Sequence, residues 1–191
     1  MGVDLRGWVE VKDTNKYGGI IPPVGQRWHG VVKANYLADR NLDLFGMLFG
    51  ISNFTNLPPV VGVRGLPPDL SLASKQDYVA WETFAQTWIT WQEFKAIDWD
   101  VDGIDGRPHM YERHGDGQLV YRGKAGPREG DIIEEGRTWE RGQYIYKVER
   151  ISRRQIRMSL NKDWELLLDL MERLARDYGD EYVRLVAWFD Q

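Results

Sequence analysis

The chain of 191 residues contains no cysteine. It therefore has no disulfide, no thiolate nucleophile and no cysteine-ligated zinc. It also lacks an uninterrupted apolar run of the roughly 18 residues that a membrane-spanning helix needs. The N-terminal residues Met1–Arg6 have neither the basic head nor the apolar stretch of a secretory signal. We therefore expect a cytoplasmic protein that does not enter a membrane.

Positive charge is not in excess, since the formal net charge is −4. A negative chain repels the phosphate backbone, so we do not expect bulk electrostatic binding to nucleic acid. Residues 150–157 include a local cluster of arginines. This cluster either meets phosphate groups or forms a solvated face balanced by acidic neighbours.

Catalytic motifs are missing. No nucleophile elbow, phosphate-binding P-loop or dinucleotide-binding glycine pattern occurs. The three histidines, His29, His109 and His114, do not have the spacing of a zinc-binding helix motif. The sequence therefore favours a binding protein over an enzyme.

Aromatic residues are abundant, with nine Trp and nine Tyr. These side chains combine a large apolar area with a polar group, which suits both mixed cores and binding surfaces. We expect most of the Trp residues in the core or half-buried on sheets.

Hydrophobic periodicity predicts the elements at the two ends of the chain. Alternation predicts strands over 3–12 and 27–36, which we expect to pair antiparallel across a turn at 15–25. Helical spacing predicts an amphipathic helix from Trp164 to Tyr178 that ends before Gly179. A last strand is expected over 181–189.

Capping residues predict shorter helices between these ends. An apolar helix is expected over 42–49, with Asp39 or Asn41 as N-cap and Gly50 after its end. A second helix is expected from Asp69 or Ser71 to about Phe84, and a third over 91–97, begun by a Thr90–Glu93 capping box. The glycine-rich residues 98–142 predict hairpins and loops, with a strand at 118–122. A further strand is expected over 143–151.

These elements predict an α+β fold. We expect one domain over 1–191, with a glycine-rich elaboration at about 98–142. A mostly antiparallel sheet would have helices packed on one face, with the first and last strands close to each other.

A polar cluster beside the apolar helix is the main candidate for a ligand site. Guanidinium groups and aromatic faces together suit a nucleotide or another small anionic, planar ligand. The predicted ligand-binding residues are Arg40, Asn41, Asp43, Arg64, Trp88 and Trp91. A structural alternative is open: Arg40 pairs with Asp43, Asn41 caps the helix, and Arg64 fixes the proline-rich loop.

An acidic loop is the second candidate. Asp98, Asp100 and Asp102, followed by Gly103, match the first half of a calcium-binding loop. Position 12 of that loop, normally a bidentate Glu, is His109. We therefore expect no cofactor; calcium binding at this loop is a hypothesis, and the alternative is a solvated acidic loop.

The chain resembles a group of small proteins encoded by bacteriophages, prophages and some bacteria. The shared motifs are the strand Asp4–Val11, the Arg-Asn-x-Asp-Leu-Phe-Gly segment at 40–46, the Arg-Gly-Leu-Pro loop at 64–67, and the strand Val183–Asp190. Residues 98–142 look particular to this chain. In that group a segment rich in Ser and His often precedes the capping box, whereas here it is Ala85–Trp88, so no histidine role is carried over. The resemblance implies a phage context and no mechanism.

We therefore expect a non-catalytic binding protein of phage type that sequesters a nucleotide-like ligand to counter host defence. One alternative is an inhibitor that binds a host enzyme through residues 98–142. Another is a metal-dependent hydrolase built on Asp98, Asp100, Asp102 and His109.

Overall fold

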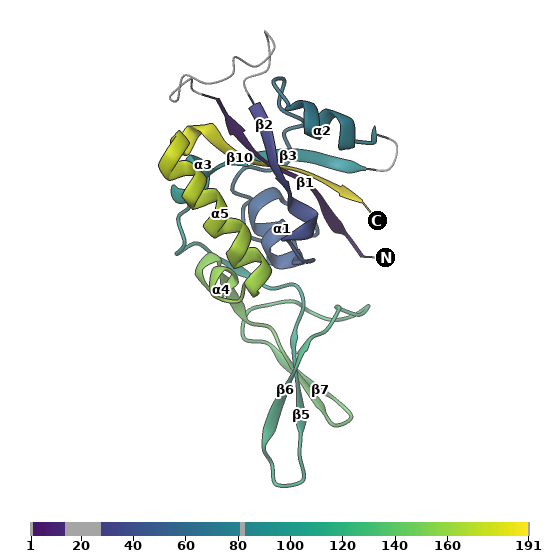
Figure 1. The fold of residues 1–191 in the computed structure, drawn as a ribbon. Coiled ribbons are helices and arrows are strands. Elements are labelled where there is room, and N and C mark those ends of the chain that lie inside the picture. The colour runs from purple at the N-terminus through teal and green to yellow at the C-terminus, as the bar shows by residue number, and fades with distance from the viewer. Residues whose placement is uncertain (1, 14–27, 81–82, 191) are drawn as a thin grey trace. The chain divides into compact units, whose positions relative to one another are not determined.

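A computed structural model describes residues 2–13, 28–80 and 83–190, and its contacts divide the chain into two compact units (Figure 1). Unit 1 comprises 1–41, 60–97 and 159–191, and unit 2 comprises 42–59 and 98–158. Both contain antiparallel sheets and helices, which confirms the α+β class. The glycine-rich segment lies in unit 2, which also takes in 42–59 and extends to residue 158.

Unit 1 is built on a four-stranded sheet in the order β2-β1-β10-β3. Its strands are β1 (Asp4–Lys12), β2 (Trp28–Lys33), β3 (Phe84–Thr90) and β10 (Val183–Asp190). All neighbouring strands are antiparallel, so the expected pairing of the first two strands and the proximity of the first and last strands are confirmed (Figure 1). The predicted turn at 15–25 lies outside the described residues. The second strand is shorter than expected, because a 3-10 helix, η1 (Ala34–Tyr36), follows it.

The helix expected from Asp69 or Ser71 to Phe84 is shorter than predicted. Helix α2 spans only Leu72–Asp77, and Ser71 caps it by accepting a hydrogen bond from the Ser74 amide at 3.2 Å. Phe84 begins strand β3 instead. The Thr, Trp and Ile residues of β3 favour strands, and pairing with β10 fixes them in one.

The two capping predictions in unit 1 are confirmed. Helix α3 (Trp91–Lys95) begins with the reciprocal Thr90–Glu93 capping box and ends two residues earlier than expected. Helix α5 (Lys162–Tyr178) has Asn161 as N-cap and ends at Gly179, whose φ of +108° favours glycine. A 3-10 helix, η3 (Asp180–Tyr182), joins α5 to β10.

Packed elements cover part of each face of the unit 1 sheet. Helix α5 packs against β1 and β10 (Figure 1). The face that carries Val186 and Trp188 packs against Leu70 and Tyr78. Helix α2 also lies on this face, because Ser74 donates to Glu10. A polar residue at an alternate position of β1 or β10 is therefore not necessarily exposed.

Unit 2 contains a four-stranded sheet in the order β6-β5-β8-β7 and the pair β4-β9. The strands are β4 (Asp102–Ile104), β5 (His109–Arg113), β6 (Leu119–Lys124), β7 (Thr138–Arg141), β8 (Tyr144–Lys147) and β9 (Arg150–Ser152). The expected hairpins and the strand near 118–122 are confirmed. The strand predicted over 143–151 is instead divided between two sheets, and helix α4 (Arg153–Met158) was not predicted.

Helix α1 (Leu42–Phe49) has the predicted bounds, and Leu44 through Phe49 are all buried. It ends at Gly50, whose φ of +78° matches the expected position after the helix. Gly46 is required by packing within unit 2, because a Cβ there would lie 2.9 Å from the Asn53 Cα atom.

Candidate functional site

Arg40 is held by a carboxylate that the sequence did not identify. Its Nε and Nη2 atoms donate to the two carboxylate oxygens of Asp4, each at 2.8 Å. The hydrogen bond from Arg40 lowers the pKa of the Asp4 carboxyl, against a smaller opposing effect of burial. The alternative that paired Arg40 with Asp43 is therefore wrong.

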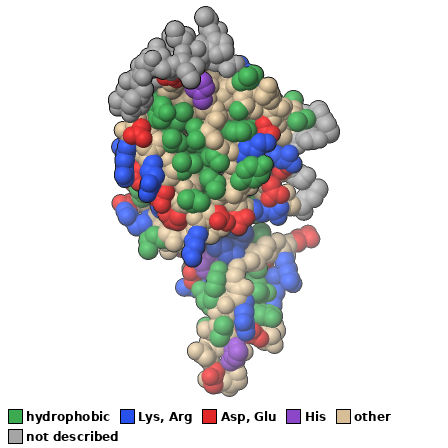
Figure 2. All heavy atoms as spheres, viewed as in Figure 1, with side chains coloured by type: hydrophobic (Ala, Val, Ile, Leu, Met, Phe, Trp, Pro, Cys, Tyr) green, Lys and Arg blue, Asp and Glu red, His purple; other side chains and the backbone are tan. Residues whose placement is uncertain are grey.

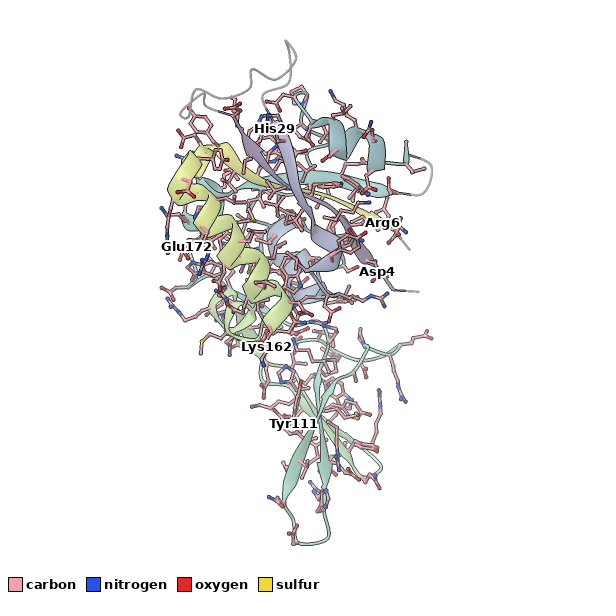
Figure 3. All side chains as sticks on the ribbon, viewed as in Figure 1. Asp4, Arg6, His29, Tyr111, Lys162 and Glu172 are labelled. Atoms are coloured by element: carbon pink, nitrogen blue, oxygen red, sulfur yellow. The ribbon has the colours of Figure 1, made fainter. Side chains whose placement is uncertain are left out.

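A polar hollow of about 450 Å³ surrounds Arg40 in unit 1. A second ion pair lines it, with Arg6 Nε 2.5 Å from Asp190 Oδ2, and Asp4 and Arg6 lie close together on β1 (Figure 3). Its lining residues are Asp4, Leu5, Arg6, Asn35, Ala38, Asp39, Arg40 and Asp190. Three carboxylates thus face two guanidinium groups that are already paired.

Arg64 and Trp88 lie together, as predicted, but in a closed arrangement. The Arg64 guanidinium stacks 3.6 Å from the centroid of the Trp88 ring, and its Nε donates to the Trp88 carbonyl oxygen at 2.9 Å. Its remaining nitrogens hold both carboxylate oxygens of Glu93 at 2.8 Å. The adjacent Gly65 amide donates to the Gln86 carbonyl oxygen. Arg64 therefore fixes the loop against β3, as the structural alternative proposed.

Trp91 and Asn41 are the remaining predicted ligand-binding residues of unit 1. Trp91 is buried and stacks on Phe94, with ring centroids 5.2 Å apart. Asn41 directly precedes helix α1. Of the six predicted ligand-binding residues, the structure brings Arg64 and Trp88 into contact.

Asp43 belongs to an ion cluster within unit 2. It accepts hydrogen bonds from Arg107 and from Lys124, the latter at 2.9 Å. Both cations also contact the buried Asp105. Burial raises the pKa of the Asp105 carboxyl, but the hydrogen bonds from Arg107 and Lys124 outweigh it, so the pKa is lowered. Asp43 is thus part of a structural cluster that ties α1 to the glycine-rich segment.

The acidic loop does not bring its carboxylates together. Asp98 Oδ1 accepts from the Asp100 amide at 3.1 Å, and Asp100 pairs with Arg154 at 2.7 Å. Asp102 lies on β4, opposite Ser152 of β9. A strand that begins at position 5 of the loop, its third ligand, does not follow the path of a calcium-binding loop.

His109 is also engaged elsewhere, since its Nδ1 lies 3.0 Å from Glu149 Oε2. In the described part of the chain, no three His, Cys, Asp or Glu side chains are grouped as metal ligands. The residues predicted for calcium, Asp98, Asp100 and Asp102, are therefore placed for loop and ion-pair roles.

A buried ion pair in unit 1 was missed from the sequence. Arg184 is 2% exposed and donates through Nε to Oε2 of Glu10, which is 0% exposed. Arg184 also pairs with Asp69 at 2.7 Å, and its guanidinium lies 3.7 Å from the centroid of the Trp28 ring. Burial raises the pKa of the Asp69 carboxyl, yet hydrogen bonds from Arg184 and Trp28 leave it lowered. This network is internally satisfied and holds the sheet together.

One face of the four-stranded sheet of unit 2 has a depression of about 530 Å³, which we call the groove. Its lining residues are Tyr111, Arg113, Leu119, Thr138, Glu140, Ile145 and Lys147. The register explains the set, because Tyr111 lies opposite Ile145, and Arg113 lies opposite Leu119. Side chains at alternate positions of the four strands share this face. Tyr111 marks it in Figure 3.

The charges around the groove are paired. Arg113 pairs with Glu140 at 2.7 Å, and Lys147 pairs with Glu149 at 2.9 Å. The Tyr111 hydroxyl donates to Glu149 at 3.2 Å, and burial together with this carboxylate raises the pKa of Tyr111. In Figure 2 hydrophobic side chains of unit 2 are interspersed with charges of both signs. The groove is therefore apolar at its floor and nearly neutral at its rim.

Comparison with known proteins gives no relative: no protein family, no curated protein and no solved structure matches the chain. Among the described residues, no helix has both the length and the apolar character needed to cross a membrane.

Proposed function

We propose that the protein is a non-catalytic binding protein, and that the groove is its binding surface for a segment of another protein. The observation that carries this proposal is the open sheet face with Tyr111, Leu119 and Ile145 between two ion pairs. In the phage context that the resemblance suggests, the partner would be a host protein.

The chemistry of the groove favours a protein over the other ligand classes. Tyr and Arg are enriched at protein interfaces, where an apolar centre is surrounded by a polar rim. Nucleic acid would need cations that are free to meet phosphates, whereas Arg113 and Lys147 each have a carboxylate partner. A partner segment should therefore present an apolar side chain to Tyr111 and Ile145, with polar groups on either side.

Selection from a random peptide library displayed on a carrier tests this function. Peptides selected on the whole protein should shift the NMR signals of Tyr111, Leu119 and Ile145. Ile145→Lys should abolish selection, because it places a charge at the floor of the groove. Ile132→Lys is the matched control: Ile132 lies in unit 2 outside the sheet strands and is 45% exposed, so selection should be unchanged.

Two outcomes contradict the proposal. In one, the selected peptides bind Ile145→Lys as well as the original chain. In the other, the NMR shifts fall outside the groove while both variants stay folded by circular dichroism.

A second candidate is a small polar ligand in the hollow around Arg40. The observation that favours it is the size and polarity of this space, which is lined by Asp39 and by Arg40 of the predicted cluster. With three carboxylates and two paired guanidinium groups, it suits a ligand with a cationic group better than the nucleotide-like anion we expected.

Thermal shift against panels of nucleotides and of small amines distinguishes these ligands. The hollow predicts stabilisation by an amine-bearing compound that is lost in Asp39→Asn. Stabilisation by nucleotides alone, if it is lost in Arg40→Ala, would support the anionic ligand that we expected from the sequence. No shift with either panel would remove this candidate.

A further inference from the structure

Strand β6 lies at one end of the unit 2 sheet, and among the described residues it pairs only with β5. A strand in this position presents a row of main-chain donors and acceptors to solvent. The end strand β3 of unit 1 is different, because Arg64, Gly65 and Gly62 contact its residues 86–88. Within the described part of the chain, a loop therefore covers the β3 edge, and no comparable loop covers the edge of β6.

β6 also exposes apolar side chains. Leu119 is 48% exposed and Tyr121 is 51% exposed. They are two residues apart and therefore lie on the same face of the strand, the face of the groove. An end strand with exposed apolar residues is a site for pairing with another strand.

Charged side chains on an edge strand often prevent it from pairing with another chain. The two cations of β6 are not free to do so. Arg122 pairs with Glu112 at 2.7 Å on the neighbouring strand. Lys124 pairs with Asp43 of helix α1 and with the buried Asp105. Both cations of β6 are thus held by carboxylates of unit 2.

We propose that β6 pairs antiparallel with β6 of a second copy of this chain. The strand is self-complementary: with Val120 on the two-fold axis, Leu119 lies opposite the partner's Tyr121. In the same register Arg122 lies opposite the partner's Gln118, so no like charges meet. The two sheets then form one continuous sheet of eight strands.

This pairing is independent of the proposed function, since it uses the edge of the sheet and the groove uses its face. The two are linked through Leu119, which lines the groove and lies on β6. In the dimer the partner's Tyr121 extends the wall of the groove beside Leu119.

Sedimentation equilibrium of the whole protein over a range of concentrations tests the proposal. The average mass should rise from that of the 22.3 kDa chain towards twice that value. Tyr121→Glu and Leu119→Glu should both remain monomeric, because each places carboxylates at the apolar contact between copies. Ile132→Glu, an equally exposed position in the same unit, should dimerise like the original chain.

The absence of cysteine allows a direct test of the register. A two-fold axis at Val120 brings the two copies of that residue within disulfide range. Val120→Cys should therefore oxidise to a covalent dimer much faster than Ile132→Cys. The proposal is overturned by a chain that stays monomeric at all concentrations, by dimers that survive both glutamate substitutions, or by cross-linking no faster than that of the control.

Discussion

Arg64 places its guanidinium 3.6 Å from the centre of the Trp88 ring and donates to the carbonyl oxygen of the same residue at 2.9 Å. One side chain thus covers both the ring and the main chain of an end strand. Glu93 holds the guanidinium in place while its own carboxylate completes the α3 capping box. Arg64 and Trp88, two residues predicted to bind a ligand, thus lie where a loop covers a sheet edge.

Arg64→Ala should destabilise unit 1. The variant loses the stacking of the guanidinium on the Trp88 ring and the hydrogen bond that Arg64 donates to the Trp88 carbonyl oxygen. Together these losses should lower the free energy of unfolding by about 1–3 kcal/mol. Denaturant unfolding measures the loss, and light scattering should show more aggregation because the β3 edge is uncovered. Arg176→Ala, which breaks an exposed pair with Glu172, should change the free energy of unfolding by less than about 0.5 kcal/mol. Equal effects of the two substitutions would contradict this role for Arg64.

Glu10→Gln should lower the free energy of unfolding more than Arg64→Ala or Arg176→Ala does. It leaves the buried Arg184 guanidinium without its fully buried carboxylate partner, which costs about 3–5 kcal/mol. Replacing both residues together, as Glu10→Gln with Arg184→Met, should recover part of this loss because no buried charge remains. Denaturant unfolding of the two single variants and the double variant gives the coupling energy. Additive losses would show that the two groups do not interact.

Unit 2 should lose stability in acid through Asp105. Its pKa is lower in the folded chain than in the unfolded one, so its stabilisation is complete above about pH 4 and is lost as the pH falls through the folded pKa. The amide of Arg107 donates to Asp105 Oδ1 at 2.9 Å, so its hydrogen exchange reports on this site. Protection of this amide should fall below about pH 4 in the original chain.

The control for this pH dependence is Asp105→Asn. It should be less stable near neutral pH by about 1–3 kcal/mol and should show a smaller change in acid, because the titrating group is gone. The same acid dependence in both proteins would assign the effect to other carboxylates.

Much of the fold was predictable because local signals and packing agree. Helix α1, the α3 capping box and helix α5 follow from apolar spacing and caps that need no distant partner. Strand β3 was missed because its stability comes from pairing with β10, a strand far away in the sequence. The division of 143–151 into β8 and β9 likewise depends on two different partner strands.

The site residues were less predictable, because charge partners are set by tertiary structure. Sequence neighbours suggested Asp43 for Arg40, whereas the partner is Asp4. Arg184 alternates with apolar residues along a strand, which normally indicates a solvent-facing position. It is buried because the sheet is covered on both faces. No sequence motif indicated the groove, because its residues come together only through the register of four strands.

The most direct test of the groove is the affinity of one selected peptide, measured by titration calorimetry against three proteins. Ile145→Lys should weaken binding by at least about tenfold, as expected for a central interface position. Ile132→Lys should bind as the original chain does. Equal affinities for all three folded proteins would contradict the assignment of the groove as the binding surface.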